Sequence, residues 1–201
     1  MDKKRAKTRK AVIKAATYLF NKYGYEETSM ENIASRAEIA AGTLYNYYSS
    51  KSILLIAIFG DMTQKIINKL PARNDGPVTE KKALADLTEI LQLVTLKTAL
   101  FSKSIMRQVL AQLFILNIED TAKLVAMDMQ IVAILLPILT DMRKANLLTK
   151  DTDLETAAIL LFGSAMVQYQ AFISIEEMSA IMLNEAIAAQ AQIILFGIIK
   201  R

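Results

Sequence analysis

The sequence contains no cysteine and no histidine among its 201 residues. Without cysteine there is no disulfide framework and no thiolate nucleophile, which is consistent with a reducing, cytoplasmic environment. Without histidine the chain lacks the commonest general base and the commonest transition-metal ligand. An enzyme would have to use carboxylates, lysine, serine or tyrosine, and neither a carboxylate pair nor a phosphate-binding loop is evident. We therefore expect no catalytic site, no metal site and no cofactor.

Turn-forming residues are also scarce, with only 6 glycines and 3 prolines. Strands need frequent turns, which are made largely from Gly, Pro, Asn and Asp. Residues that favour helices, such as Ala, Leu, Ile, Met and Lys, are abundant instead. Because apolar residues make up 53% and charged residues 22% of the chain, a sizeable core is available. The composition predicts an all-α fold with long helices.

The chain shows neither a secretion signal nor a clear membrane span. Its N-terminus is basic but lacks an unbroken apolar segment and a small-residue cleavage site. Residues 156–175 carry no charge and are long enough to cross a bilayer. They include several polar side chains and have no flanking basic cluster, so we interpret them as a buried helix of a soluble protein. We expect no membrane partner.

The net charge of +4 is unevenly distributed along the chain. Residues 1–51 hold ten basic and five acidic side chains, whereas the remainder is slightly acidic, and six basic residues crowd between Lys3 and Lys10. This excess is compatible with a solvated terminus, and equally with contacts to phosphate that release counterions. Charge alone does not decide between these interpretations.

Periodic apolar residues and turn signals predict about nine helices. Gly24 suits a left-handed stop after the first, and Thr28 with Glu31 resembles a capping box at the start of the second. Pro137 predicts a kink or break in the seventh, and residues 71–79 are the clearest loop. The predicted helices span 6–23, 28–37, 41–48, 51–70, 80–101, 103–116, 120–145, 153–175 and 177–200.

The second and third helices are short and are separated by the tight turn 38–40, which is helix-turn-helix geometry. In such a motif the second helix of the pair enters the major groove of DNA. Leu44 and Tyr48 would anchor that helix, and Lys51 could meet a phosphate together with nearby backbone N–H groups. The surface available to DNA would consist of Ala41, Gly42, Thr43, Tyr45 and Tyr47.

The sequence resembles the TetR family of bacterial transcriptional regulators in two segments, TSMENIASRA (28–37) and GTLYNYYSSKSIL (42–54). The resemblance covers residues 6 to about 55. It implies an N-terminal three-helix DNA-binding domain over 1–51 and a larger helical ligand-binding and dimerisation domain over 52–201. Two positions depart from the family pattern, because Glu38 stands where a turn glycine is usual and Ala40 where Ser or Thr is frequent.

The resemblance also implies roles for individual residues. Ser29 and Tyr47 would contact phosphate, Thr43 and Tyr45 would approach bases, and Lys51 would secure the DNA backbone. Each also has a structural interpretation, since the tyrosines could be packed aromatics and Thr43 ordinary helix surface. We favour the DNA contact for Tyr47 and Lys51.

The last two predicted helices are too apolar for solvent and carry small residues that allow close helix approach. We expect them to form a four-helix homodimer interface, which would place two recognition helices one DNA turn apart on a pseudo-palindrome. The middle helices are rich in adaptable methionine and in phenylalanine, which predicts a pocket for a hydrophobic or amphipathic effector, although for any single residue we favour a place in the core. The candidate effector residues are Met62, Phe101, Met106, Gln108, Phe114, Met127, Gln168, Tyr169 and Phe172.

The sequence therefore predicts a ligand-responsive transcriptional repressor that binds a double-stranded operator as a dimer. The alternative is a helical small-molecule carrier or interaction protein whose basic N-terminus is incidental. Only residues 1–51 argue against that alternative.

Overall fold

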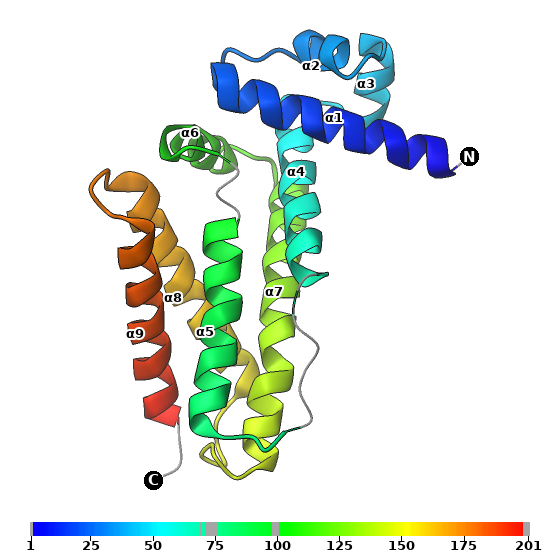
Figure 1. Cartoon of the computed structure of the whole chain (residues 1–201). Coiled ribbons are helices and arrows are strands. Elements are labelled where there is room, and N and C mark those ends of the chain that lie inside the picture. Colours follow the sequence, from blue (N-terminus) through cyan, green and yellow to red (C-terminus); the bar gives the residue numbers. More distant parts are fainter. Residues whose placement is uncertain (1, 69, 71–75, 98–100, 199–201) are drawn as a thin grey trace. The chain divides into compact units, whose positions relative to one another are not determined.

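The computed structural model describes residues 2–68, 70, 76–97 and 101–198, and these form nine α-helices and no β-strand (Figure 1). The predicted all-α fold is confirmed. Within the described residues the helices are α1 (Asp2–Tyr23), α2 (Met30–Arg36), α3 (Ala41–Tyr47), α4 (Lys51–Ile67), α5 (Glu80–Lys97), α6 (Lys103–Leu113), α7 (Ile118–Lys144), α8 (Leu154–Ser174) and α9 (Ala180–Ile198).

The helix limits follow the predictions to within four residues, and the differences at the first, second and fourth helices are as follows. The first helix begins at Asp2 and not near residue 6, so the basic residues lie on helix α1. The second is capped by Ser29 and not by Thr28, whose hydroxyl instead donates to the Gly24 carbonyl at 2.7 Å. Helix α4 ends at Ile67, before the predicted limit of residue 70. Residues 71–75 of the predicted loop and 98–100 of the predicted fifth helix lie outside the described residues.

The sequence predicts a kink or a break at Pro137. Helix α7 continues through this residue, so a break is wrong and the kink stays a prediction. A proline inside a helix leaves the carbonyl four residues earlier without its donor. That residue is Ala133, which is exposed, so water can satisfy the carbonyl and the helix need not end.

The chain divides into two compact units, one made of residues 1–62 and 99–124 and the other of residues 63–98 and 125–201. In the first unit, α1 packs against α2 and α2 against α3. Their shared core consists of apolar side chains with no exposure to solvent, which are Val12, Ala16, Phe20, Ile33 and Leu44. The predicted functional division at residue 51 stays a prediction.

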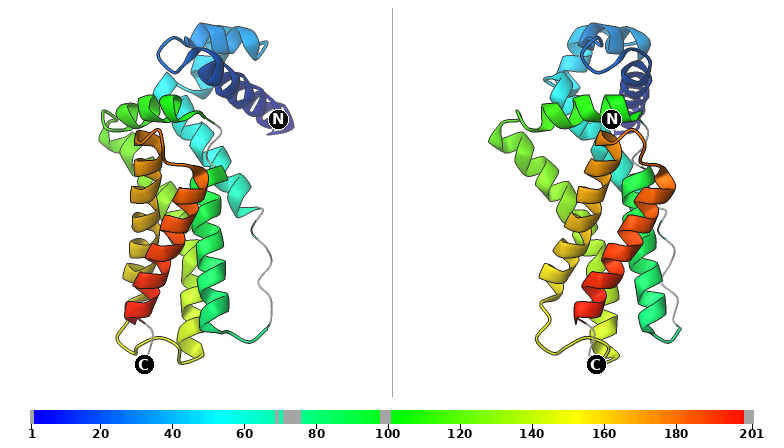
Figure 2. Two further views of the ribbon diagram at one scale, coloured as in Figure 1. Left: turned by 60° about the vertical axis from the view of Figure 1, so that its left-hand side comes forward. Right: turned by 90° about the vertical axis from the view of Figure 1, so that its left-hand side faces the viewer.

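In the second unit α8 and α9 pack together, and α5 packs against both, as the views in Figure 2 agree. Leu87 of α5, Leu161 of α8 and Leu183 of α9 are fully buried in this unit. By length and composition alone, α7, α8 and residues 180–197 of α9 could each cross a membrane. In this structure 22% of the apolar window of α7, 39% of that of α8 and 22% of that of α9 are buried, so the burial expected for residues 156–175 is only partial.

Candidate nucleic-acid interface

Helix α2 begins at a side-chain cap and is held by its inner face. The Ser29 hydroxyl accepts a hydrogen bond from the Asn32 N–H at 3.1 Å, which satisfies one of the donors that a helix start leaves without a partner. Met30, Ile33 and Ala34 are buried below it. Ser29 is half-buried at the start of α2, where its predicted phosphate contact would have to be made.

The turn between α2 and α3 has the geometry that glycine favours, but it carries Glu38 with a φ of 56°. The Ile39 N–H donates to the Ala34 carbonyl at 3.0 Å and the Glu38 N–H to the Ser35 carbonyl at 3.1 Å. These two bonds form a Schellman motif, whose left-handed position is Glu38. Glu38 therefore stands in place of the usual glycine, and the turn keeps the geometry that glycine would give it.

Helix α3 follows directly and has no side-chain cap, because Ala40 offers only its backbone carbonyl to the Leu44 N–H at 3.1 Å. Leu44 is fully buried and Tyr48 is 3% exposed, so the predicted anchor is confirmed. Of the predicted DNA-facing residues, Gly42, Thr43 and Tyr45 are exposed, whereas Ala41 and Tyr47 are half-buried.

Two tyrosines of α3 contact neighbouring charged side chains. The Tyr45 hydroxyl donates to a Glu31 carboxylate oxygen of α2 at 3.2 Å. This bond helps to hold the pKa of Glu31 below its usual range, after the larger effect of the backbone N–H at Glu31, and it raises the pKa of Tyr45. The Tyr47 ring lies 5.9 Å from the Arg5 guanidinium carbon. The basic start of α1 therefore reaches the recognition helix.

Lys51, predicted to secure the DNA backbone, donates to three carbonyl oxygens of the linker between α1 and α2. The distances from its Nζ are 2.6 Å to Tyr25, 3.2 Å to Glu26 and 3.1 Å to Thr28. Burial lowers the pKa of the ammonium, and the carboxylates of Glu26 and Glu27 act in the opposite direction. Lys51 thus ties the start of α4 to the linker, and its phosphate contact stays a prediction.

The same linker also receives two side chains of α6. The Gln108 Oε1 accepts from the Tyr25 N–H at 3.1 Å, and the Gln112 Nε2 donates to a Glu26 carboxylate oxygen at 2.9 Å. Tyr25 is 2% exposed and packs on Phe20 with ring centroids 5.2 Å apart. The sequence signals missed this role of Tyr25 and Gln112, since nothing local connects residues so distant in the chain.

The candidate effector residues are distributed over both units. In the first, Met62, Phe101 and Met106 are buried, Gln108 binds Tyr25, and Phe114 is 84% exposed. In the second, Tyr169 is buried with its ring centroid 6.3 Å from that of Phe172. The remaining two, Met127 and Gln168, are half-buried. The structure thus brings Tyr169 and Phe172 together on α8, and effector binding by the nine residues stays a prediction.

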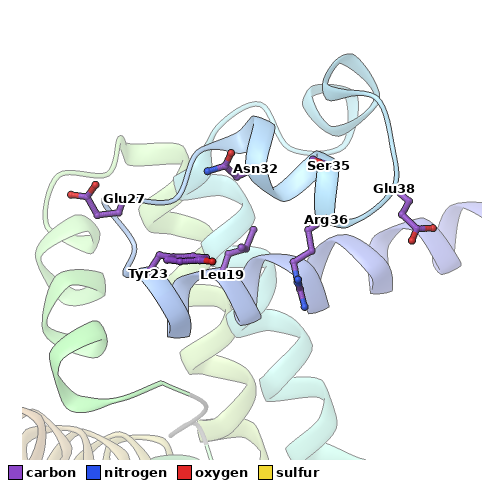
Figure 3. A pocket seen from close by; sticks show the side chains of 7 residues that line it. All are labelled: Leu19, Tyr23, Glu27, Asn32, Ser35, Arg36 and Glu38. Atoms are coloured by element: carbon purple, nitrogen blue, oxygen red, sulfur yellow. The ribbon is translucent and has the colours of Figure 1, made fainter.

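An open groove of about 860 Å³ lies between α1 and α2, and its lining includes none of these residues (Figure 3). Leu19 and Tyr23 come from α1, and Arg36 comes from α2. Glu27 and Glu38 bring carboxylates to the same groove. An open groove with charges of both signs does not suit a hydrophobic effector, which needs a concave and mostly apolar site. A smaller concavity of about 50 Å³ in the other unit includes Lys82, Asp86 and Asp141 and is also polar.

Helices α8 and α9 each expose a face with large apolar side chains. On α8 the exposed fractions are 42% for Ile159, 55% for Leu160 and 62% for Val167, with Gly163 exposed between them. These residues share one helix face, because they follow the i, i+4 and i+8 spacing with Leu160 adjacent. On α9 the exposed apolar residues are Ile181, Met182, Ile193 and Phe196.

Comparisons with known proteins agree with this geometry. Residues 12–58 match the family "Bacterial regulatory proteins, tetR family". The chain is 40% identical over 58 residues to the HTH-type transcriptional repressor KstR of Mycolicibacterium smegmatis, covering 29% of this chain and 28% of that protein. It is 32% identical over 102 residues to KstR of Rhodococcus jostii, covering 49% and 47%. The matched part therefore spans less than half the length of these relatives.

The likeness in fold extends over nearly the whole chain. The transcriptional regulator FadR of Bacillus subtilis, in complex with stearoyl-CoA, has a TM-score of 0.66 at 19% identity and covers 94% of this chain and 98% of its own. A TetR transcription regulator of Haloarcula marismortui has a TM-score of 0.71 at 14% identity, covering 97% and 100%. The helix-turn-helix over α2 and α3 thus lies in a segment that matches the tetR family of bacterial regulatory proteins, and the chain as a whole shares the fold of these regulators.

Proposed function

We propose that this protein is a cytoplasmic, ligand-responsive transcriptional repressor that binds a pseudo-palindromic DNA operator as a homodimer. The observation that carries the proposal is the two-sided helix α3, which is anchored by buried Leu44 and Tyr48 and exposes Gly42, Thr43 and Tyr45. A helix of this kind, preceded by a short capped helix and a tight turn, suits insertion into the major groove. The basic residues of α1 add favourable contacts with phosphate.

A DNA-binding experiment tests the proposal directly. Selection from a random duplex library should enrich one pseudo-palindrome, and its affinity should fall as salt concentration rises, because phosphate contacts release counterions. Tyr47→Ala should weaken binding to all sequences, since its predicted partner is phosphate and not a base. Tyr23→Ala, which alters an exposed tyrosine near the end of α1, serves as the control for loss of an aromatic ring.

Dimerisation through α8 and α9 supports this function. Exposed apolar residues of this size are costly in water, and a contiguous set of them is typical of an interface. A four-helix arrangement with a second copy would cover both faces and hold two α3 helices about 34–36 Å apart, as adjacent major grooves require. Analytical ultracentrifugation that finds only monomer at micromolar concentration would contradict this part of the proposal.

The effector is proposed to be hydrophobic or amphipathic. Stearoyl-CoA, which is bound in the structure of B. subtilis FadR, is an example of such a ligand on the same fold. Induction then requires that the ligand bind more tightly to a dimer whose recognition helices are wrongly spaced for DNA. Native mass spectrometry of the purified protein, followed by DNA-binding measurements with the retained compound, tests this step.

A carrier or interaction protein is the competing function. If it were correct, the selection would enrich no duplex, and removal of the charge at the start of α1 would leave the function unchanged. Salt-dependent binding to a selected operator excludes that alternative.

A further inference from the structure

Helix α3 has an inner and an outer face, and one polar side chain projects from the middle of the outer face. Leu44 is fully buried. Gly42 and Asn46 lie two residues before and two residues after it, so at 3.6 residues per turn both point away from the core. Both are exposed, and because Gly42 has no side chain, only Asn46 extends outward there.

The amide of Asn46 is available for a partner. It makes no hydrogen bond to the part of the chain that the structure describes. The neighbouring aromatic groups are already engaged, since the Tyr45 hydroxyl donates to Glu31 at 3.2 Å and the Tyr47 ring lies beside Arg5 and Tyr48. Asn46 therefore has donor and acceptor groups on the outer face that no contact among the described residues uses.

Gly42 leaves free space on the outer face of α3, one turn before the Asn46 amide. A methyl group built at Gly42 would meet no other heavy atom within 4 Å, so packing within the described residues does not require a glycine. Side chains on a helix lean toward its N-terminus and cover the preceding turn. An Asn46 side chain that follows this tendency would extend toward the turn that Gly42 leaves bare, where the helix backbone can approach a base edge closely.

The chemistry of the amide selects one base. In the major groove adenine presents the N7 acceptor beside the N6 amino donor, and the asparagine amide matches this pair with Nδ2 and Oδ1. We propose that Asn46 reads one adenine in each half-site, with Nδ2 donating to N7 and Oδ1 accepting from the N6 amino group. This inference rests on the proposed DNA-binding function and adds to it the base that the helix recognises.

The test compares base preferences of the full-length parent and two variants, Asn46→Ala and Asn32→Ala. Asn32 is an exposed asparagine of α2 that lines the α1–α2 groove (Figure 3), so it controls for loss of an amide elsewhere in the motif. Selection from a random duplex library should give the parent and Asn32→Ala the same profile. Asn46→Ala should lose an adenine preference of about tenfold at one position per half-site, with its salt dependence unchanged.

A modified base then separates a direct contact from an indirect one. Replacing that adenine by 7-deazaadenine removes the N7 acceptor, so affinity should fall several-fold for the parent and not at all for Asn46→Ala. If Asn46→Ala keeps the parental profile, or if both proteins respond equally to 7-deazaadenine, this inference is overturned while DNA binding stands. If the parent enriches no sequence, the proposed function fails and this inference fails with it.

Discussion

The ammonium nitrogen of Lys51 lies 2.6 Å from the carbonyl oxygen of Tyr25 and 4.3 Å from the centroid of the same residue's ring. One side chain thus holds both the backbone and the aromatic face of the linker between α1 and α2. Cation–π contacts and charge-assisted hydrogen bonds are both stronger where solvent is partly excluded. Lys51, which the sequence predicts as a DNA contact, therefore also stabilises the DNA-binding unit.

Lys51→Met should lower the free energy of unfolding by about 2 kcal/mol, because three carbonyls lose a donor while the apolar stem is kept. Lys14→Met, at an exposed lysine of α1, should change it little. Urea denaturation followed by circular dichroism measures both. If Lys51 served phosphate alone, stability would be unchanged and only the salt dependence of DNA binding would fall, by a slope of about one.

Glu38→Gly should raise the free energy of unfolding by about 1 kcal/mol, because a side chain at positive φ is strained and glycine is not. Asn146 provides a matched control. It has the same φ of 56° and ends α7 in the same way, with the Leu147 N–H bonded to the Met142 carbonyl at 2.9 Å. Because asparagine tolerates this conformation better, Asn146→Gly should gain less, and an equal gain in the two variants would contradict the explanation.

Local signals predicted much of the fold and of the motif. Apolar periodicity placed the helices that the described residues form, and the burial of Leu44 and Tyr48 followed from their spacing alone. The sequence alone identified Glu38 as an unusual residue for this turn, because the geometry of the turn depends on residues 34–39 only. Where an interaction is local in sequence, its physical consequences could be worked out from the residue types.

Long-range contacts could not be predicted in this way. Lys51 bonds carbonyls 23 to 26 residues earlier, and Gln108 bonds an N–H 83 residues away. Periodicity indicates which face of a helix is buried but not what it meets. For the same reason the sequence suggested Gln108 only as a candidate effector contact. In the structure its Oε1 accepts a hydrogen bond from the Tyr25 N–H.

Tyr48→Phe should leave stability unchanged or raise it by up to about 1 kcal/mol. The Tyr48 hydroxyl is buried and has no hydrogen-bond partner among the described residues, so the phenol is desolvated without compensation. Tyr25→Phe is the matched control, because its buried hydroxyl pairs with the Ser52 hydroxyl at 3.4 Å. Thermal unfolding should show a loss for Tyr25→Phe only, and a loss of equal size in both would contradict this account.

We expect the carboxylate of Asp153, the N-cap of α8, to stabilise the protein and acid to remove this stabilisation. The Thr156 hydroxyl donates to its carboxylate at 2.6 Å, and backbone N–H groups add to this, so the pKa of Asp153 lies below its ordinary value of 3.8. A lowered pKa in the folded state means that the stabilisation is complete above the unfolded value and is lost as pH falls through the folded one. Asp153→Asn should therefore be less stable than the parent at neutral pH.

The difference between these two proteins should shrink below pH 4 or so, since asparagine keeps the capping oxygen but not the charge. Denaturation midpoints measured from neutral to acidic pH test this. A difference that stays constant across the range would show that the charge of Asp153 contributes nothing.

Gly163→Leu should weaken the proposed dimer while stabilising the protomer. Gly163 is exposed on α8 between Leu160 and Val167, and among the described residues a methyl group there would meet no heavy atom within 4 Å outside the nearby helix backbone. Leucine also favours a helix interior over glycine by about 0.8–1 kcal/mol. Lost assembly therefore cannot be attributed to misfolding, because only the close approach of a second helix would be blocked.

Gly42→Leu is the matched control, since Gly42 is an exposed helical glycine with equally open surroundings in the DNA-binding unit. Sedimentation velocity at micromolar concentration should find the parent and Gly42→Leu as dimers and Gly163→Leu shifted toward monomer. DNA binding should fall in both variants for different reasons, through a blocked α3 surface in one and through loss of the paired half-sites in the other. If Gly163→Leu stays dimeric, the exposed face of α8 is not the interface, and the pairing of two α3 helices must depend on another surface.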